Sequence, residues 1–274
     1  MPLRPDLHPG SVEITWLRQA GFLIQGPTSA VLVDAFLTDF DGTVVPPGRT
    51  PEELAWVDVV LATHEHADHF DGPAWGRIAT ASSTTRFVVP EPVVALAVDA
   101  GVPADRVVGA RPDAPLEFND LRIEPLPALH GVEVADAYTH GLELEPPGYR
   151  YLGYVVDLNG VRIYHAGDTI VYEGMADRLL GLRPDVALVP INGRDFFREA
   201  QGIVGNFDIR EAAELAAEIG VDLVIPMHYD AVAGNTQAPG PFVDHVRATH
   251  PDLPVLLPAR LVPFVYTRSA GRPQ

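Results

Sequence analysis

The sequence predicts an α/β fold in which helices cover the outer faces of β-sheets. Residues 11–36 alternate apolar and polar side chains over short runs that Ala20-Gly21 and Gly26-Pro27 interrupt, which is typical of antiparallel strands. Later apolar runs of strand length alternate with helical segments. Strands that come first in antiparallel pairs and then alternate with helices indicate sheets with helices packed on their outer faces.

Continuous apolar runs mark the expected strands after residue 36. The run at 56–64 contains Val57, Val59, Val60 and Leu61, which favours a strand buried on both faces. Further strand-like runs lie at 86–90, 121–131, 151–158, 161–168, 185–193, 221–230 and 253–266.

The clearest helical segment is 207–220. Asp208 can cap its N-terminus, Glu211 follows three residues later as in a capping box, and Gly220 can end the helix. Its apolar face carries Ile209, Ala212, Ala216 and Ile219. Shorter helices are expected at 91–101 and 172–181, and 131–148 is interpreted as a long loop that either lies near the site or is a plain surface excursion.

Length and composition indicate an ordinary globular chain. We expect residues 1–274 to form one domain, since single α/β domains of this size are common and 47% of the residues are hydrophobic. No apolar run is long enough to span a bilayer, and the N-terminal residues show no apolar secretory segment. The expectation is a cytoplasmic protein without a membrane partner.

Cysteine is absent and the formal charge is −18. Any metal must therefore be held by nitrogen and oxygen. The negative charge opposes a nucleic-acid partner, because proteins that bind nucleic acids usually carry a basic patch. A small-molecule substrate is favoured. An anionic substrate stays open if arginines gather in one pocket, and a homo-oligomer stays open because no interface can be recognised in the sequence.

The segment HEHADH places four metal-ligand types where the apolar run at 56–64 stops. His64, His66, Asp68 and His69 would point in different directions on a helix, but they can converge in a turn that leads from a strand into a helix. Imidazole nitrogen and carboxylate oxygen suit divalent ions such as zinc or manganese. Without a cation, these clustered polar groups would be desolvated and left without a partner.

Three further ligand types also stand where apolar runs end. They are His130, Asp168 and His228. The carboxyl ends of strands are where α/β sheets assemble their sites, so we expect these residues to join the cluster and to complete a site for two divalent cations, zinc or manganese with iron as an alternative.

The motif H-x-H-x-D-H followed by a lone His, a Gly-Asp pair and a late His resembles the metallo-β-lactamase superfamily. The resemblance covers nearly the whole chain and implies an αββα sandwich of two mixed sheets flanked by helices. It also implies that His64, His66 and His130 hold one metal, that Asp68, His69 and His228 hold the other, and that Asp168 bridges them. Within the superfamily, the segments IYHAGDT, VALVPINGRD and VIPMHYD are similar to the L-ascorbate-6-phosphate lactonase family.

The predicted activity is hydrolysis of a small lactone or ester, including a sugar-phosphate lactone. Two cations that share a water lower its pKa toward neutrality and make hydroxide the nucleophile. Asp68 is expected to move a proton as well as bind metal. His165 is either a proton donor or outer partner of the site, or a histidine packed against the sheet.

Substrate contacts are expected from residues on the loops beside the site. Arg194 either clamps a phosphate or carboxylate or pairs with an acidic residue in a structural ion pair. The other candidates are Asn192, Asn206 and Tyr229. Two alternative functions stay open: a phosphodiesterase or nuclease, because the same hydroxide can attack phosphorus, and a metal-binding protein without hydrolytic activity.

Overall fold

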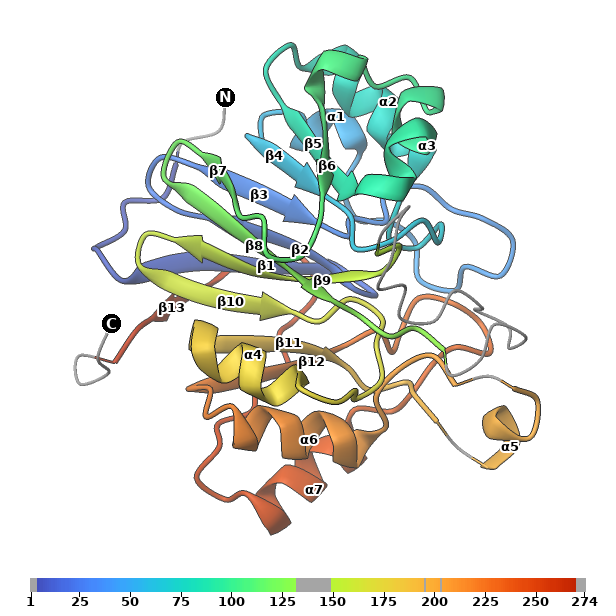
Figure 1. The fold of residues 1–274 in the computed structure, drawn as a ribbon, viewed down its shortest axis with the longest axis vertical. Coiled ribbons are helices and arrows are strands. Elements are labelled where there is room, and N and C mark those ends of the chain that lie inside the picture. The colour runs from blue at the N-terminus through green and yellow to red at the C-terminus, as the bar shows by residue number, and fades with distance from the viewer. Residues whose placement is uncertain (1–3, 132–148, 195, 203, 270–274) are drawn as a thin grey trace.

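The computed structural model, which describes residues 4–131, 149–194, 196–202 and 204–269, forms two mixed β-sheets packed face to face between two layers of helices (Figure 1). This αββα arrangement is the predicted fold class. The strands of the first sheet are, in spatial order, β13 (Phe264–Thr267), β1 (Ser11–Arg18), β2 (Gly21–Gln25), β3 (Ala30–Val33), β4 (Val59–Leu61), β5 (Arg86–Pro90) and β6 (Val107–Ala110). Those of the second are β12 (Leu223–Met227), β11 (Val186–Pro190), β10 (Val161–His165), β9 (Leu152–Leu158), β8 (Leu121–Pro127) and β7 (Leu116–Phe118).

Each sheet changes from antiparallel to parallel pairing along its width. In the first sheet β13, β1, β2 and β3 pair antiparallel, as the alternation at 11–36 predicts, and β3 to β6 pair parallel. In the second sheet β7 to β10 pair antiparallel, and β10, β11 and β12 pair parallel. The parallel strands need crossover connections, and helices provide them.

Helices cover both outer faces (Figure 1). On the first sheet these are α1 (Pro51–Leu54), α2 (Gly72–Ala81) and α3 (Val94–Asp99), with 3₁₀ turns at Glu91–Val93 and Ala104–Arg106. On the second sheet they are α4 (Met175–Leu182), α6 (Ile209–Glu218) and α7 (Gly240–Thr249), while α5 (Phe196–Glu199) projects to one side. Of the helices that the structure describes, none combines the length and apolarity needed to cross a bilayer.

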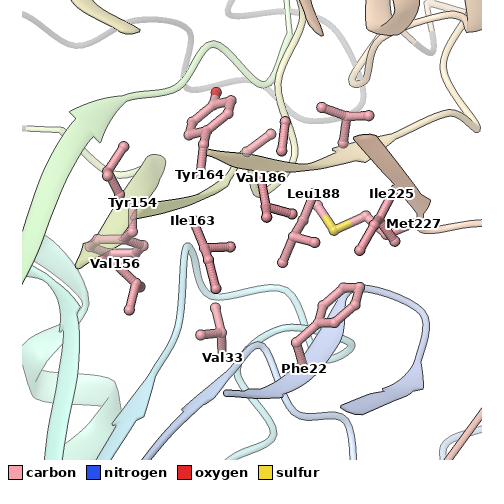
Figure 2. Close-up of a cluster of buried hydrophobic side chains, with 14 of the residues drawn as sticks. Phe22, Val33, Tyr154, Val156, Ile163, Tyr164, Val186, Leu188, Ile225 and Met227 are labelled. Carbon is pink, nitrogen blue, oxygen red and sulfur yellow. The ribbon is translucent and has the colours of Figure 1, made fainter. Parts of the chain in front are cut away.

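The core lies between the sheets. Phe22 and Val33 of the first sheet face Ile163, Leu188 and Met227 of the second, and all five are fully buried (Figure 2). A second cluster lies under the outer helices, where Trp75 of α2 packs at 5.3 Å between ring centroids against Phe87 of β5. The two clusters fix the orientation of both sheets, and with it the edge at which their strands end.

One predicted strand is shorter than its apolar run. The strand β13 begins only at Phe264, near the end of the segment 253–266, and Val255 contributes an isolated bridge to Val224. Pro254, Pro258 and Pro263 interrupt the segment, and proline has no N–H to donate to a sheet.

Helix α6 begins as predicted. The carboxylate of Asp208 accepts hydrogen bonds from the N–H groups of Arg210 and Glu211, both at 2.8 Å, and the Glu211 side chain accepts from Asp208 N–H at 3.0 Å. Gly220 follows the helix with φ +65°, a left-handed conformation that glycine tolerates.

We expect Asp208→Ala to lower the free energy of unfolding by about 1 kcal/mol, because two helix N–H groups lose their acceptor. Chemical denaturation monitored by circular dichroism measures this loss. Asp244→Ala, at an exposed position within α7, is the control and should stay within about 0.5 kcal/mol of the wild type. Equal stability of the two variants would contradict the capping role.

Candidate metal centre

Strand ends from both sheets bring the seven predicted ligands together. His64, His66, Asp68 and His69 lie in the loop between β4 and α2. His130, Asp168 and His228 follow β8, β10 and β12 of the second sheet. The loop before α2 is held by Asp71, whose carboxylate caps α2 at Ala74 N–H and accepts from Leu37 and Thr38 N–H.

A first group contains His64, His66, His130 and Asp168. One donor atom from each lies within 4.8 Å of the others. His64 Nε2 and His66 Nδ1 are 2.8 Å apart, and His130 Nε2 lies 3.6 Å from Asp168 Oδ2. Tyr151 closes one side of this group, with its ring centroid 5.4 Å from that of His64 and 5.2 Å from that of His130.

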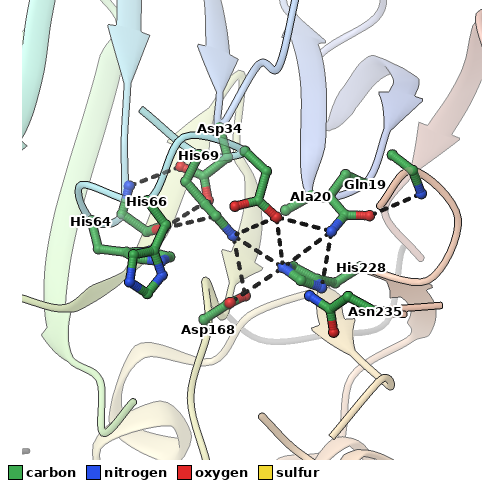
Figure 3. A network of polar contacts seen from close by, with 12 residues as sticks. Gln19, Ala20, Asp34, His64, His66, His69, Asp168, His228 and Asn235 are labelled. Carbon is green, nitrogen blue, oxygen red and sulfur yellow. Dashed lines mark hydrogen bonds and ion pairs between the residues drawn. The ribbon is translucent and has the colours of Figure 1, made fainter. Parts of the chain in front are cut away.

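A second group contains Asp68, His69 and His228, and Figure 3 labels the two histidines. The Nε2 atoms of His69 and His228 are 3.1 Å apart. Asp68 Oδ2 lies 3.3 Å from His228 Nε2 and 3.8 Å from His69 Nε2. These three donor atoms therefore converge on one position.

Asp168 contacts both groups. Its Oδ1 lies 3.3 Å from His69 Nε2, and its Oδ2 lies 3.2 Å from His228 Nε2 in addition to the contact with His130. The two groups consequently share a carboxylate, which is the arrangement that the resemblance implies for a bridging ligand.

The opposite ring nitrogens of several histidines are held by the protein. His69 Nδ1 lies 2.7 Å from Asp34 Oδ2, and His130 Nδ1 lies 2.6 Å from the carbonyl oxygen of Gly205. The hydroxyl of Thr63 donates to Asp34 and lies 3.0 Å from His64 Nδ1. Such contacts orient imidazoles so that the other nitrogen faces a metal.

Burial and neighbouring charges shift the pKa values of these residues in opposite directions. Burial lowers the pKa of His130 to about 4 and that of His64 well below its ordinary value. Burial also disfavours charge on His228, but Asp168 and Asp68 outweigh it and raise the pKa to about 9. For Asp168, burial opposes ionisation, yet His228 and His69 hold its pKa well below the usual range.

Gln19 and Asp34 belong to the site although the sequence analysis did not select them. The amide Nε2 of Gln19 donates to Asp68 Oδ2 at 2.9 Å and lies 3.3 Å from His228 Nδ1 (Figure 3). Asp34 directly follows β3, so its position at a strand end was a usable signal. Gln19 lies in a hairpin turn, and no sequence pattern marks it.

His165 is fully buried at the end of β10. Its Nε2 lies 2.8 Å from the carbonyl oxygen of Ala20, and its Nδ1 accepts from Gly167 N–H at 3.2 Å. Burial lowers its pKa. Both ring nitrogens thus have backbone partners, and the ring links the β1–β2 turn to the Gly167-Asp168 pair.

Two of the predicted substrate contacts form a buried amide chain. Asn206 Nδ2 donates to Asn192 Oδ1 at 2.9 Å, and Asn192 Nδ2 donates to Asn235 Oδ1 at 2.6 Å. Asn206 follows Gly205, whose carbonyl oxygen contacts His130. The buried Asn206 Oδ1 has no hydrogen-bond partner within the described ranges.

The other two predicted contacts are Arg194 and Tyr229, and they differ in their surroundings. Arg194 forms an ion pair with Glu211 of α6, so the structural ion pair is the alternative that the structure shows. Tyr229 is half-buried, packs 5.2 Å from Trp16 between ring centroids, and has a pKa that burial raises to about 12. Residues 132–148 and Asp195 lie outside the described residues, and the predicted loop with them.

Comparisons with known proteins identify the family. A sequence profile described as "Beta-lactamase superfamily domain" matches residues 29–229. A UPF0173 metal-dependent hydrolase of Methanoculleus marisnigri is 33% identical over 223 residues, covering 80% of this chain and 81% of the relative. A second UPF0173 metal-dependent hydrolase, from Rubrobacter xylanophilus, is 31% identical, and the match covers 87% of this chain and 90% of that relative. The chain belongs to the metallo-β-lactamase superfamily.

Solved structures of other hydrolases share the fold. A metallo hydrolase from Ignicoccus hospitalis has a TM-score of 0.71 at 22% identity, covering 94% of this chain and 100% of its own. An isothiocyanate hydrolase from Delia radicum gut bacteria has a TM-score of 0.73 at 19% identity, covering 93% and 100%. The narrower likeness to L-ascorbate-6-phosphate lactonases finds no specific support among these relatives.

The donor set of this superfamily member fits divalent cations. Ring nitrogens of neighbouring histidines face one another at 2.8 and 3.1 Å, where each pair can share only one proton, whereas a cation can accept both lone pairs. The remaining donors are the ring nitrogen of His130 and the carboxylate oxygens of Asp68 and Asp168, and the chain has no cysteine. Zinc, manganese and iron all accept such ligands.

We expect His66→Ala and His228→Ala each to lower the metal content of the purified chain, because each removes a donor from a different group. Elemental analysis after dialysis measures this. His245→Ala is the control, because His245 lies on α7 and near Glu214, outside both groups. Full metal content in both site variants would refute the assignment of the two groups.

Proposed function

We propose that this protein hydrolyses a small lactone or ester with a water molecule activated between two divalent cations, zinc, manganese or iron. The observation that carries the proposal is the contact of Asp168 with both groups of donors. A carboxylate that contacts both groups would allow two cations to bind next to each other, and such a pair could jointly activate one water molecule. The relatives named metal-dependent hydrolases support the reaction class.

Two bound cations would lower the pKa of a shared water and polarise a carbonyl oxygen. The residues of the chain supply the rest. Asp68 Oδ2 lies at the second group and can take a proton from the attacking water. The contacts of His69 with Asp34 and of His130 with Gly205 keep these rings in place, so the donors need no rearrangement during the reaction.

The charges around the site favour an uncharged substrate. Arg150, close to the histidine loop, forms an ion pair with Glu65, and Arg194 pairs with Glu211. An anionic substrate would need one of these guanidinium groups to exchange its carboxylate for the ligand. A neutral lactone or ester requires no such exchange, and Tyr229 and Asn206 remain as candidate hydrogen-bonding contacts.

A sugar-phosphate lactone is the second candidate within the same reaction. Asn192 and Arg194 lie in the segment that follows β11, and Arg194 could exchange Glu211 for a phosphate if the substrate carried one. Comparison of the same lactone with and without its phosphate separates this candidate from the first.

We expect the zinc- or manganese-loaded chain to hydrolyse uncharged lactones or aryl esters faster than phosphorylated lactones, and both faster than bis(p-nitrophenyl) phosphate. The measurement is kcat/KM across this panel after removal of metal and reloading with each ion. Asp168→Ala should lower activity on every substrate at least about 100-fold, because it removes the donor shared by both groups. A chain that cleaves the phosphodiester best would instead be a phosphodiesterase. Metal-loaded chain that is inert across the panel would overturn the hydrolase proposal.

A further inference from the structure

The turn between β1 and β2 breaks a local rule of hairpin formation. Arg18 pairs with Gly21, so Gln19 and Ala20 form a two-residue turn, and Gln19 has φ +53°. Two-residue hairpin turns place the first central residue at positive φ, where glycine and asparagine are preferred. A buried glutamine at this position is strained, and such strain persists only where surrounding contacts hold it.

Four contacts from different parts of the chain hold the Gln19 backbone and its neighbour. Gln19 N–H donates to Asp230 Oδ1 at 2.8 Å, and its carbonyl oxygen accepts from His228 N–H at 3.0 Å and Trp16 Nε1–H at 3.1 Å. The carbonyl oxygen of Ala20 lies 2.8 Å from His165 Nε2. These contacts fix the point from which the Gln19 side chain enters the site.

The amide of Gln19 is directed by both of its ends. Its Oε1 accepts from Ala231 N–H at 3.1 Å, so Nε2 is the end that faces the donor groups. Nε2 donates to Asp68 Oδ2, the same oxygen that lies 3.3 Å from His228 Nε2 (Figure 3). The side chain is fully buried, so solvent cannot replace this donor.

These contacts all concern one group of donors. At the site, the side chain of Gln19 contacts Asp68 and His228, and both belong to the second group. In the first group, which consists of His64, His66, His130 and Asp168, the histidines contact Thr63, Gly205 and Tyr151. Gln19 therefore contacts donors of the second group, whereas Thr63, whose hydroxyl also lies 3.4 Å from His69 Nδ1, lies beside donors of both groups.

We propose that Gln19 is a positioning residue that fixes Asp68 and His228 for the cation of the second group and has little influence on the first. This inference rests on the proposed two-cation site. Residues that orient metal ligands typically change metal affinity by roughly 10- to 100-fold when they are replaced. Loss of the Gln19 amide should therefore weaken the binding of one cation and leave the binding of the other unchanged.

The test is a titration of the metal-stripped full chain with Co²⁺, followed by the visible absorption of bound cobalt and by elemental analysis. In Gln19→Met, which keeps side-chain length and removes the amide, the second equivalent should bind roughly 10- to 100-fold more weakly. The first equivalent should keep its affinity and its spectrum. Gln19→Gly should show the same selective loss while its thermal midpoint stays within about 4 °C of the wild type, because glycine suits the positive φ.

Matched controls separate positioning from general damage. Gln25→Met makes the same change at another buried glutamine, whose Nε2 donates to Glu13 at 2.6 Å away from both groups. Asn119→Gly relieves another positive φ, +55°, in the turn between β7 and β8. Both controls should bind two equivalents of Co²⁺ as the wild type does.

The possible failures are distinct. If the wild type binds two equivalents and both Gln19 variants keep the affinity of the second, or lose both equivalents equally, the positioning role is wrong while the proposed function stands. If the wild type itself binds a single equivalent, the two-cation site fails, and the inference about Gln19 fails with it.

Discussion

The contact of one carboxylate with two groups of imidazoles is the constraint on which the site depends. Asp168 reaches His69, His130 and His228 at 3.2–3.6 Å, and these histidines follow strands of different sheets. Carboxylates and imidazoles are expensive to bury singly, and together they offset each other's charge. The chain can therefore gather them only where both sheets end at the same edge, and the layered core between the sheets fixes that edge.

The core explains why residues distant in the chain converge without a large rearrangement. The apolar faces of both sheets are buried against each other over β1 to β4 on one side and β8 to β12 on the other. This packing sets the spacing between the loop after β4 and the loops after β8, β10 and β12. A small change in the sheet packing would move the two sources of donors relative to each other, so the stability of the core and the geometry of the site are coupled.

The sequence was sufficient for the donors because their chemistry and their strand-end positions coincide. Four donors lie close together in one loop, namely His64, His66, Asp68 and His69, and each remaining donor ends an apolar run. The hydrophobic pattern and the residue type therefore point to the same positions. The start of α6 was predictable for the same reason, since the residues of a capping box are local. The role of Arg194 could not be decided from the sequence. Its partner Glu211 lies 17 positions away on a helix, and a guanidinium group can pair equally well with a carboxylate of the protein or with an anionic substrate.

Backbone conformation was the feature that sequence could not supply. Eight described residues other than glycine have positive φ, and three of them, Gln19, Asp34 and His228, contact the donors or are donors themselves. Several of the other five lie in tight turns, where asparagine and aspartate tolerate this conformation. Gln19 also lies in a tight turn and Asp34 is an aspartate, but contacts from distant parts of the chain hold all three site residues as well. Their conformations are held by Thr63, Ala231 and Asp230, together with the carbonyl oxygen of Gln19, which accepts from His228 N–H.

Strained residues held from several sides have a consequence for cation binding. Contacts that impose an unfavourable φ on a residue also restrict its side chain, so the polar atoms of Asp34, Gln19 and His228 are held in fixed positions. A cation that binds to donors already fixed loses less free energy to side-chain ordering than one that must assemble them. The protein thus accepts a conformational penalty during folding, and the contacts of its two sheets supply the stability that offsets it. The sequence places the donors, and the tertiary structure fixes their orientation.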